Sequence, residues 1–195
     1  EMRVIGGKYR SRVLAEFKGE DVRPTSDRAK EALFNILAYS CINARALDLF
    51  SGSGALGIEC LSRGAKEVVF NDFSKDSLAI LKKNLTALKI PVNGEEAKVY
   101  NYDYSVCLDA MQGQFDLIFL DPPYRFDYGE KALEKIAKKN LLSKTGIAIY
   151  ERDRAFDGEI EGLEKFDIAK LPPKFVPVSA SSAGLFRNAT AALVS

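Results

Sequence analysis

The sequence predicts an α/β fold with a doubly wound, mostly parallel sheet. Over residues 44–151, short apolar runs of strand length alternate with amphipathic segments that have helical spacing. One of these runs, residues 115–120, is apolar at almost every position, which is typical of a strand buried on both faces. Because parallel strands are joined by helical crossovers, the alternation favours a sheet covered by helices on its two sides.

Each expected element has its own local signal. Ser74 can cap a helix in which Leu78, Leu81 and Leu85 share one face, and Gly64 closes the preceding helix. Strands are expected at residues 44–50, 67–71, 97–102, 115–120 and 147–151. Helices are expected at residues 55–63, 74–88, shortly after 102, and 128–139, with a turn at 143–146. Beyond a break at residues 172–173, strand-like sequence continues to residue 193.

Residues 2–40 look like a small extension on a main domain that spans residues 41–195. Residues 3–14 predict two short strands around Gly6-Gly7, in the manner of a hairpin. A helix-start cluster follows at residues 24–27, and the helix is expected to run to about Tyr39. The hairpin carries a basic stretch without acids, formed by Arg3, Lys8, Arg10 and Arg12. On charge alone, that stretch fits a solvated surface and a nucleic-acid contact equally well.

Composition excludes several kinds of chemistry. The chain has no histidine, so catalysis by Ser-His-Asp or Cys-His groups is excluded and a zinc site is not expected. Its three cysteines are odd in number and far apart, which fits reduced thiols in a cytoplasmic protein. No apolar run approaches the ~20 residues that cross a bilayer, and no signal-peptide pattern opens the sequence.

A glycine loop directly follows the first expected strand of the main domain. Its pattern, Gly52-x-Gly54-x-x-Gly57, permits a sharp turn and a close approach of a ligand to the backbone. The loop alone fits a nicotinamide dinucleotide and other nucleoside cofactors equally well. In open parallel sheets, such ligands bind where the carboxyl ends of the strands meet.

Three acids at successive strand ends narrow the choice of ligand. Asp48 would repel a pyrophosphate but could pair with a cationic amino acid, Asp72 could accept two ribose hydroxyls, and Asp103 could accept an adenine amino group. Any one of the three fits a simple turn or cap, but all three together do not. The set predicts an amino-acid nucleoside that carries a sulfonium charge, S-adenosylmethionine.

The tetrapeptide Asp121-Pro122-Pro123-Tyr124 ends the strand at 115–120. The prolines remove two N–H donors and stiffen the backbone, so the preceding carbonyls and the Asp121 carboxyl form a compact set of acceptors for a planar amino group. Tyr124 adds an aromatic face on which a base can stack. A carboxylate beside the amine also stabilises the positive charge that develops during methyl transfer.

These motifs resemble a known family. Residues 48–59 and 121–124 look like the cofactor and catalytic motifs of class I methyltransferases that act on amino groups. Residues 3–12, 23–28 and 31–37 resemble the RsmD family specifically, and the likeness covers residues 2 to about 151. The resemblance implies a seven-stranded Rossmann-like sheet and methylation of N2 of one guanine in small-subunit (16S) rRNA, without a metal and with S-adenosylhomocysteine as product.

The resemblance and the residues together give the candidate sites. Members of the family usually carry glutamate where this chain has Asp72, and Tyr-Gly where it has Ala183-Gly184. The catalytic candidates are Asp121, Pro122, Pro123 and Tyr124. The cofactor-binding candidates are Asp48, Phe50, Gly52, Ser53, Gly54, Asp72, Phe73, Asp103, Tyr104, Arg23, Pro24 and Thr25. The RNA-binding candidates are Arg3, Lys8, Tyr9, Arg10, Arg12 and Arg125.

The substrate is expected to be ribosomal RNA in a small-subunit particle or assembly intermediate. The net charge is only +1 and the extension is small, so RNA folded by ribosomal proteins fits better than tight binding of naked RNA. No membrane and no obligate protein partner are expected, and the chain is expected to be a monomer.

Three alternatives compete with this interpretation. A nicotinamide oxidoreductase would use the same glycine loop but leaves the tetrapeptide unexplained. An adenine-N6 methyltransferase of RNA or DNA uses a similar tetrapeptide, although the DNA enzymes often carry a large recognition domain. A catalytically silent RNA-binding assembly factor would not need both motifs intact.

Overall fold

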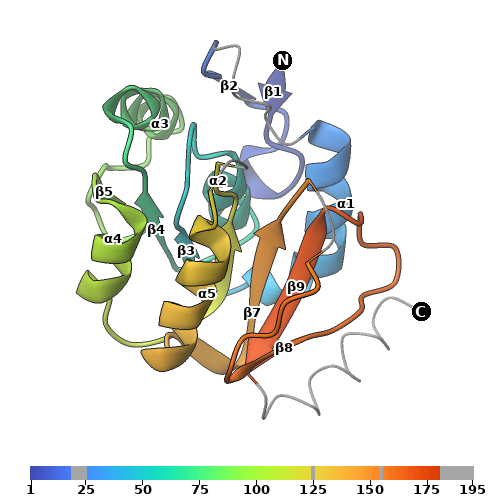
Figure 1. The fold of residues 1–195 in the computed structure, drawn as a ribbon. Helices are drawn as coiled ribbons and strands as arrows, with labels where there is room; N and C mark the ends of the chain where they lie inside the picture. Colours follow the sequence, from blue (N-terminus) through green and yellow to red (C-terminus); the bar gives the residue numbers. More distant parts are fainter. Residues whose placement is uncertain (19–25, 124–125, 154–155, 181–195) are drawn as a thin grey trace.

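The computed structural model describes residues 1–18, 26–123, 126–153 and 156–180. A seven-stranded sheet with helices on both faces forms its centre (Figure 1). The strands of this sheet are β3 (Arg45–Asp48), β4 (Glu67–Asn71), β5 (Ala97–Tyr100), β6 (Phe115–Leu120), β7 (Leu142–Glu151), β8 (Leu163–Lys165) and β9 (Phe175–Ala180). Their order is β5-β4-β3-β6-β7-β9-β8. The strands from β5 to β7 pair in parallel, and β9 pairs antiparallel with both of its neighbours.

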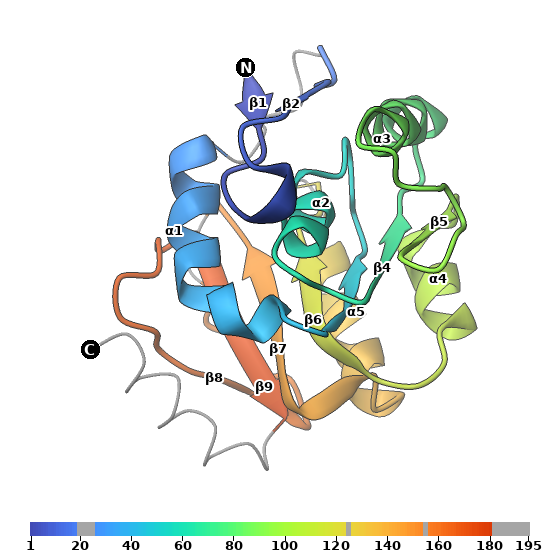
Figure 2. The ribbon, with the colours of Figure 1, turned by 180° about the vertical axis from the view of Figure 1, so that it is seen from behind.

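The helices divide between the two faces of the sheet, as Figures 1 and 2 show from opposite sides. They are α1 (Asp27–Leu37), α2 (Ala55–Ser62), α3 (Lys75–Ala87), α4 (Tyr104–Ala110) and α5 (Tyr128–Lys138). One hydrophobic cluster joins α1, α2 and α3 to the sheet, and a second joins α4 and α5 to it. Along β3, Ala46 belongs to the first cluster and Leu47 to the second. Both faces are therefore buried, and the predicted doubly wound fold is confirmed.

The sheet changes direction between β3 and β6. From β3 the chain proceeds outward through β4 to β5, and it then returns to the other side of β3 as β6. At such a switch point the connections leave in opposite directions and open a crevice at the carboxyl ends of the strands. The glycine loop follows β3 and the tetrapeptide follows β6, so the fold brings both motifs to this crevice.

Local signals place the helix ends close to their predicted positions. The side chains of Ser26 and Ser74 accept hydrogen bonds from the N–H groups of Ala29 and Ser77, which caps α1 and α3. Gly64 follows α2 with a φ of 106°, a left-handed conformation that favours glycine. The predicted helix start at residues 24–25 and the strand-like sequence from 181 to 193 lie outside the described residues.

The N-terminal hairpin differs from its prediction. Strands β1 (Met2–Arg3) and β2 (Val13–Leu14) pair antiparallel, but Gly6-Gly7 does not form a tight turn between them. A 3₁₀ turn, η1 (Gly7–Tyr9), lies in the connection instead, and its residue Gly7 lies against the backbone of Ser62 in α2. The chain follows the surface of α2, so the connection is longer than a tight turn allows.

The predicted turn at residues 143–146 is wrong. These residues belong to β7, which begins at Leu142 rather than at residue 147. The register shifts there, since Phe115 pairs with Leu142 and Leu117 pairs with Ile147. The irregularity absorbs the extra residues without ending the strand. A hydrogen bond of 3.1 Å from the Ser143 hydroxyl to Asp116 holds this part of β7 against β6.

The extension packs into the same core as the sheet. Met2, Val4 and Leu14 are each at most 3% exposed and belong to the cluster that contains α1 and α2. The domain boundary at residue 40 therefore remains a prediction from sequence. Within the described part of the chain, no helix combines the length and apolar character that crossing a membrane requires.

Candidate active site

A pocket of about 580 Å³ lies at the carboxyl ends of the central strands, beside the switch point. Its volume is within the usual range of small-molecule sites. The described wall is built from the segments that follow β3, β4, β5 and β6. It is lined by Leu49, Phe50, Gly52, Asn71, Asp72, Phe73, Ser77, Tyr102, Asp103, Tyr104, Asp121, Pro122, Pro123, Phe126 and Tyr128. Two predicted motifs that are far apart in sequence thus face one cavity.

The glycine loop joins β3 tightly to α2. Gly54 caps α2 in a left-handed conformation with a φ of 91°, and a Cβ on Gly57 would overlap the Phe70 ring. Gly57 donates its N–H to the Asp48 carboxylate at 3.0 Å. Asp48 is 1% exposed and lies beneath the loop rather than on the described pocket wall. Burial raises its pKa to about 7, although the Gly57 hydrogen bond lowers it in part.

Asp72 and Asp103 both lie on the pocket wall. The two carboxylate oxygens of Asp72 accept the N–H groups of Gly52 and Ser74, both at 2.8 Å. Burial raises the pKa of Asp72 above its ordinary value, and these two hydrogen bonds oppose the rise. Asp103 caps α4 by accepting the Ser105 N–H at 2.9 Å. Carboxylate oxygens have further lone pairs, so both acids retain acceptor capacity toward the cavity.

Asn71 is a pocket residue that the sequence analysis missed. Its side-chain amide donates to the carbonyls of Leu49 and Tyr102 at 3.2 and 3.0 Å, and its oxygen accepts the Tyr102 N–H at 3.1 Å. It therefore ties together the ends of β3, β4 and β5. Asn71 directly precedes Asp72 at the end of an apolar strand. This position is the sequence signal that could have identified it as a pocket residue.

Aromatic rings form one side of the pocket. The rings of Phe50 and Tyr104 lie 5.6 Å apart, Tyr104 and Tyr128 lie 4.8 Å apart, and Phe126 stacks on Tyr128 at 4.8 Å with an interplanar angle of 13°. Phe73 is 77% exposed and also lines the pocket. Phe50, Phe73 and Tyr104 were predicted, whereas Phe126 and Tyr128 were not. Loop and helix-start positions carry no periodic signal, so only the fold brings these two rings to the cavity.

Asp121, Pro122 and Pro123 line the pocket as the direct continuation of β6. Burial raises the pKa of the Asp121 carboxyl well above its ordinary value, and the neighbouring charges of Glu151 and Asp48 raise it further. The remaining candidates in this region, Tyr124, Arg125, Arg23, Pro24 and Thr25, lie outside the described residues. Ser53 follows Gly52 in the loop, and its hydroxyl contacts the Met2 sulfur at 3.9 Å.

The candidate RNA-binding residues of the extension do not form one continuous basic patch. Arg3 pairs with Glu1 at 2.9 Å, Lys8 lies 3.6 Å from Glu96, and Arg12 donates to the carbonyl of Ala87 at 2.7 Å. Each of these three side chains therefore contacts a different part of the protein. Arg10 is exposed, and Tyr9 is partly buried against the core.

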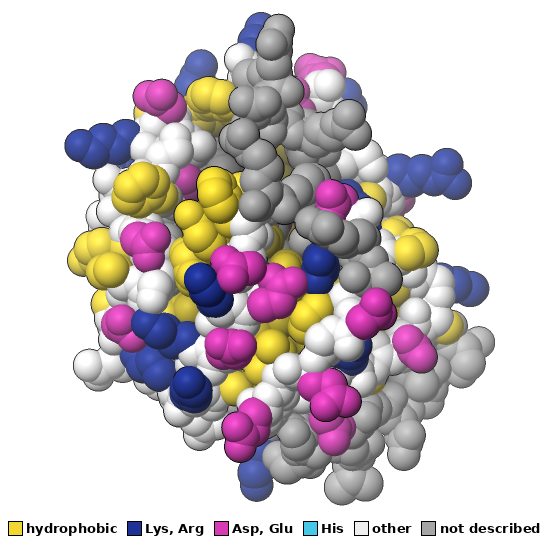
Figure 3. Space-filling model, viewed as in Figure 1, with side chains coloured by type: hydrophobic (Ala, Val, Ile, Leu, Met, Phe, Trp, Pro, Cys, Tyr) yellow, Lys and Arg dark blue, Asp and Glu magenta, His cyan; other side chains and the backbone are white. Residues whose placement is uncertain are grey.

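Charges of both signs are mixed on the face drawn in Figure 3. In its described part, acidic and basic side chains alternate, with hydrophobic side chains exposed between them. This face therefore differs from the dense single-sign surface typical of a protein that binds naked nucleic acid tightly.

Comparison with known proteins identifies the family. The model of a family described as conserved hypothetical protein 95 matches residues 2–171. Ribosomal RNA small subunit methyltransferase D of Haemophilus influenzae is 40% identical over 156 residues, which cover 79% of this chain and 80% of that protein. The chain belongs to the RsmD family. The resemblance of residues 3–12, 23–28 and 31–37 to this family is thereby confirmed.

Other RsmD-like proteins agree with this assignment. Putative rRNA methyltransferase YlbH of Bacillus subtilis is 38% identical over 156 residues, which cover 78% of this chain and 83% of that one. The solved structure of putative methyltransferase yhhF from Escherichia coli superposes with a TM-score of 0.77 at 28% identity and covers 93% of this chain. The superposition also covers 98% of that structure, so the two chains share one fold over nearly the whole of it.

Proposed function

We propose that this chain transfers the methyl group of S-adenosylmethionine to the exocyclic N2 amino group of a guanine in small-subunit rRNA. The observation that carries the proposal is that Asp121 of the tetrapeptide lines the same pocket as Asp72 and Asp103. The cofactor acids and the amine-binding acid therefore face one cavity. Membership in a family whose relatives are named rRNA methyltransferases supports the RNA substrate.

The pocket fits the cofactor. Asp72 is rigidly held by two backbone N–H groups and can accept the ribose hydroxyls, and Asp103 can accept the adenine amino group. The exposed ring of Phe73 and the ring of Tyr104 offer faces for the adenine. Space is open above Gly52, where a Cβ would meet no atom within 4 Å. When bound, the sulfonium supplies an electrophilic methyl group.

Asp48 has an indirect part in this proposal. It lies beneath the loop and accepts the N–H of Gly57, so it holds the start of α2 in place. When Asp48 is ionised, its negative charge also favours a cationic amino acid near this loop. In the described residues Asp48 does not line the cavity, and Arg23, Pro24 and Thr25 are proposed to complete that end of the site.

The residues of the tetrapeptide act on the substrate amine. The Asp121 carboxyl can accept an amino hydrogen and so orient the nitrogen lone pair, because the guanine amine is otherwise delocalised into its ring. It also stabilises the positive charge that develops on the nitrogen. The two prolines hold this acceptor rigidly, and positioning of the reacting groups then supplies much of the rate enhancement.

The extension is proposed to contact RNA around the pocket mouth. The cations of residues 3–12, with Tyr9 and Arg125, would hold phosphates or stack while the target guanine enters the pocket. The net charge of only +1, and the mixed charge of the face drawn in Figure 3, favour rRNA folded in a small-subunit particle as the substrate. We further propose that the enzyme acts as a monomer in the cytoplasm and needs no metal.

Labelling of small subunits tests the function. The protein is incubated with tritiated S-adenosylmethionine and small subunits that lack the modification, and the labelled nucleoside is identified after digestion. We expect N2-methylguanosine, and we expect the label to fall at least a hundredfold in Asp121→Ala. Labelled N6-methyladenosine would overturn the substrate, and no label with intact cofactor binding would favour a silent assembly factor. Faster reaction on deproteinised rRNA than on particles would contradict the particle as substrate.

A further inference from the structure

Asp121 has an acidic neighbour that the tetrapeptide does not contain. Strands β6 and β7 run in parallel with Leu120 opposite Tyr150, so the next residues, Asp121 and Glu151, lie side by side where the two strands end. Their carboxyl groups are close enough to be joined by one shared proton, and Glu151 raises the pKa of Asp121. Glu151 is 3% exposed, so this contact is shielded from solvent.

Lys174 forms an ion pair with Glu151. The Lys174 ammonium lies 2.7 Å from a Glu151 carboxylate oxygen and comes from the segment directly before β9. Among the described residues, the charged groups that act on Asp121 are Glu151 from β7, Asp48 from β3 and Lys174. Asp121 lines the pocket, so a substrate amine can approach it from the cavity.

We propose that Glu151, anchored by Lys174, is a positioning residue that orients the Asp121 carboxyl toward the substrate amine through a shared proton. The inference rests on the proposed function, because it concerns the acid that would hold the target amino group. Two carboxyl groups that share a hydrogen bond carry one proton between them. The Lys174 ammonium stabilises negative charge on Glu151, so the shared proton belongs on Asp121.

This arrangement gives Asp121 a defined direction. Its O–H donates to Glu151, so its other oxygen presents lone pairs to the pocket. Asp121 also loses its proton only at a higher pH than an ordinary aspartate, because burial and the charges of Glu151 and Asp48 raise its pKa. With one proton on two carboxyl groups, the pair still carries one negative charge beside the amine, which stabilises the positive charge that develops there.

The test compares Glu151→Gln with Lys174→Met. Removal of the negative charge in Glu151→Gln is expected to lower the pKa of Asp121, and removal of the cation in Lys174→Met is expected to raise it. Carboxyl ¹³C NMR of aspartate-labelled protein, with Asp121→Asn to assign the signal, measures this value without substrate. We expect shifts on the order of one pH unit in opposite directions. Exposed Glu161→Gln and Lys144→Met serve as charge-matched controls that leave the signal in place.

The pH dependence of kcat provides the second readout. The alkaline limb of the profile, where the shared proton is lost, should move to lower pH in Glu151→Gln and to higher pH in Lys174→Met, with KM for S-adenosylmethionine unchanged within about twofold. A loss of activity at every pH with the Asp121 signal unmoved would show that Glu151 is only structural and overturn the inference. If the wild-type protein methylates no guanine while the NMR shifts appear, the proposed function fails and the Asp121–Glu151 coupling stands.

Discussion

At the scale of single residues, the fold uses buried polar groups to fix the segments around the pocket. Asp48 is enclosed beneath the glycine loop, with the Gly57 N–H as its hydrogen-bond donor. Burial favours the neutral form of a carboxyl group, and the nearby acids Asp72 and Glu151 add to this effect. Below about pH 7 Asp48 is therefore mostly neutral, and its ionisation at higher pH lowers stability.

We predict that Asp48→Asn removes part of the pH dependence of stability. The pKa of Asp48 is about 7 in the folded protein and about 4 in the unfolded chain, so the folded state holds an extra proton between these values. Stability therefore falls as pH rises through this window and does not recover above it. At about 1.4 kcal/mol per unit, the difference of about three units contributes on the order of 4 kcal/mol.

Urea unfolding at pH 5 and pH 8.5 measures the effect. The variant should match the wild type at pH 5 within about 1 kcal/mol and exceed it by about 2–4 kcal/mol at pH 8.5. An asparagine oxygen can still accept the Gly57 N–H, so the comparison isolates the charge. Equal pH dependence in the two proteins would show that Asp48 is not buried in its neutral form.

A second residue-scale prediction concerns Asn71. Asn71→Ala removes the amide that donates to the carbonyls of Leu49 and Tyr102. This loss is expected to lower the free energy of unfolding by about 2–4 kcal/mol. The substitution should also weaken binding of S-adenosylhomocysteine, because Asn71 no longer joins the ends of β3, β4 and β5 at the pocket. Calorimetry measures this binding. The exposed Asn35→Ala on α1 is the control and should change stability by less than about 0.5 kcal/mol.

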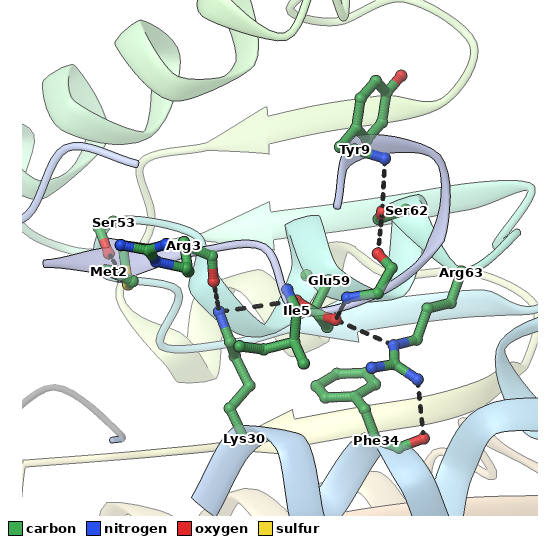
Figure 4. Close-up of polar contacts among 12 residues, drawn as sticks. Met2, Arg3, Ile5, Tyr9, Lys30, Phe34, Ser53, Glu59, Ser62 and Arg63 are labelled. Atoms are coloured by element: carbon green, nitrogen blue, oxygen red, sulfur yellow. Dashed lines mark hydrogen bonds and ion pairs between the residues drawn. The ribbon is translucent and has the colours of Figure 1, made fainter. Parts of the chain in front are cut away.

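At the scale of elements, α2 anchors the N-terminal extension (Figure 4). The fully buried Glu59 accepts the N–H groups of Ile5 and Gly6 and the Nε of Arg63, each at 2.9 Å. Lys30 of α1 is equally buried, lies 3.6 Å from Glu59 and donates to the carbonyl of Arg3 at 2.7 Å. One carboxylate thus joins α1, α2 and the extension.

The extension also contacts the glycine loop. Asn84 of α3 donates to the carbonyls of Ala15 and Ser53 and accepts the Ala15 N–H. The Ser53 hydroxyl contacts Met2 from the other side. The proposed RNA-contacting segment and the proposed cofactor loop are therefore both held by Asn84.

We predict that Glu59→Gln detaches the extension. The substitution leaves Lys30 and Arg63 without their buried counter-charge, which is expected to cost about 3–5 kcal/mol. Urea unfolding measures this loss, and hydrogen exchange at the amides of Ile5 and Gly6 should accelerate. The matched control is Glu96→Gln, whose exposed pair with Lys8 should contribute less than about 1 kcal/mol. Unchanged exchange at both amides would contradict the anchoring role.

At the scale of the whole molecule, the sheet order determines where chemistry can occur. Adjacent placement of β3 and β6 brings the glycine loop and the tetrapeptide to one crevice, although about 65 residues separate them in sequence. Hydrophobic cores on both faces of the sheet make this edge rigid. The extension, folded onto α2, lies against the glycine-loop side of the crevice.

We predict that Arg10→Glu impairs substrate recognition without affecting the cofactor. Arg10 is exposed on the extension, so the reversal should lower kcat/KM for small subunits by about tenfold and reduce its salt dependence. Binding of S-adenosylhomocysteine should not change. Lys144→Glu is the control, because Lys144 is exposed at the opposite end of the sheet, near the start of β7. An equal effect of both reversals would indicate only a general charge effect.

Sequence alone predicted most of the elements and both motifs, but it gave no signal for β8. Periodic burial predicted β4 and β6 at their observed bounds and the helices within a few residues, because burial on one or both faces leaves a repeating pattern. Asp72, Asp103 and Asp121 were predicted at strand ends because parallel strands present those ends at one edge. The predicted turn at 143–146 failed because an irregular register can absorb polar residues inside a strand.

Only the tertiary structure decided which side chains meet. Asn71, Phe126 and Tyr128 reach the pocket through the ends of different elements, and Glu151 meets Asp121 through the register of β6 and β7. Contacts of this kind depend on strand order and register, which a local pattern does not encode. The burial of Asp48, and hence its raised pKa, likewise arises from packing of α2 onto the sheet. The motifs thus predict the reaction, and the fold determines which neighbouring side chains surround the site residues and shift their pKa values.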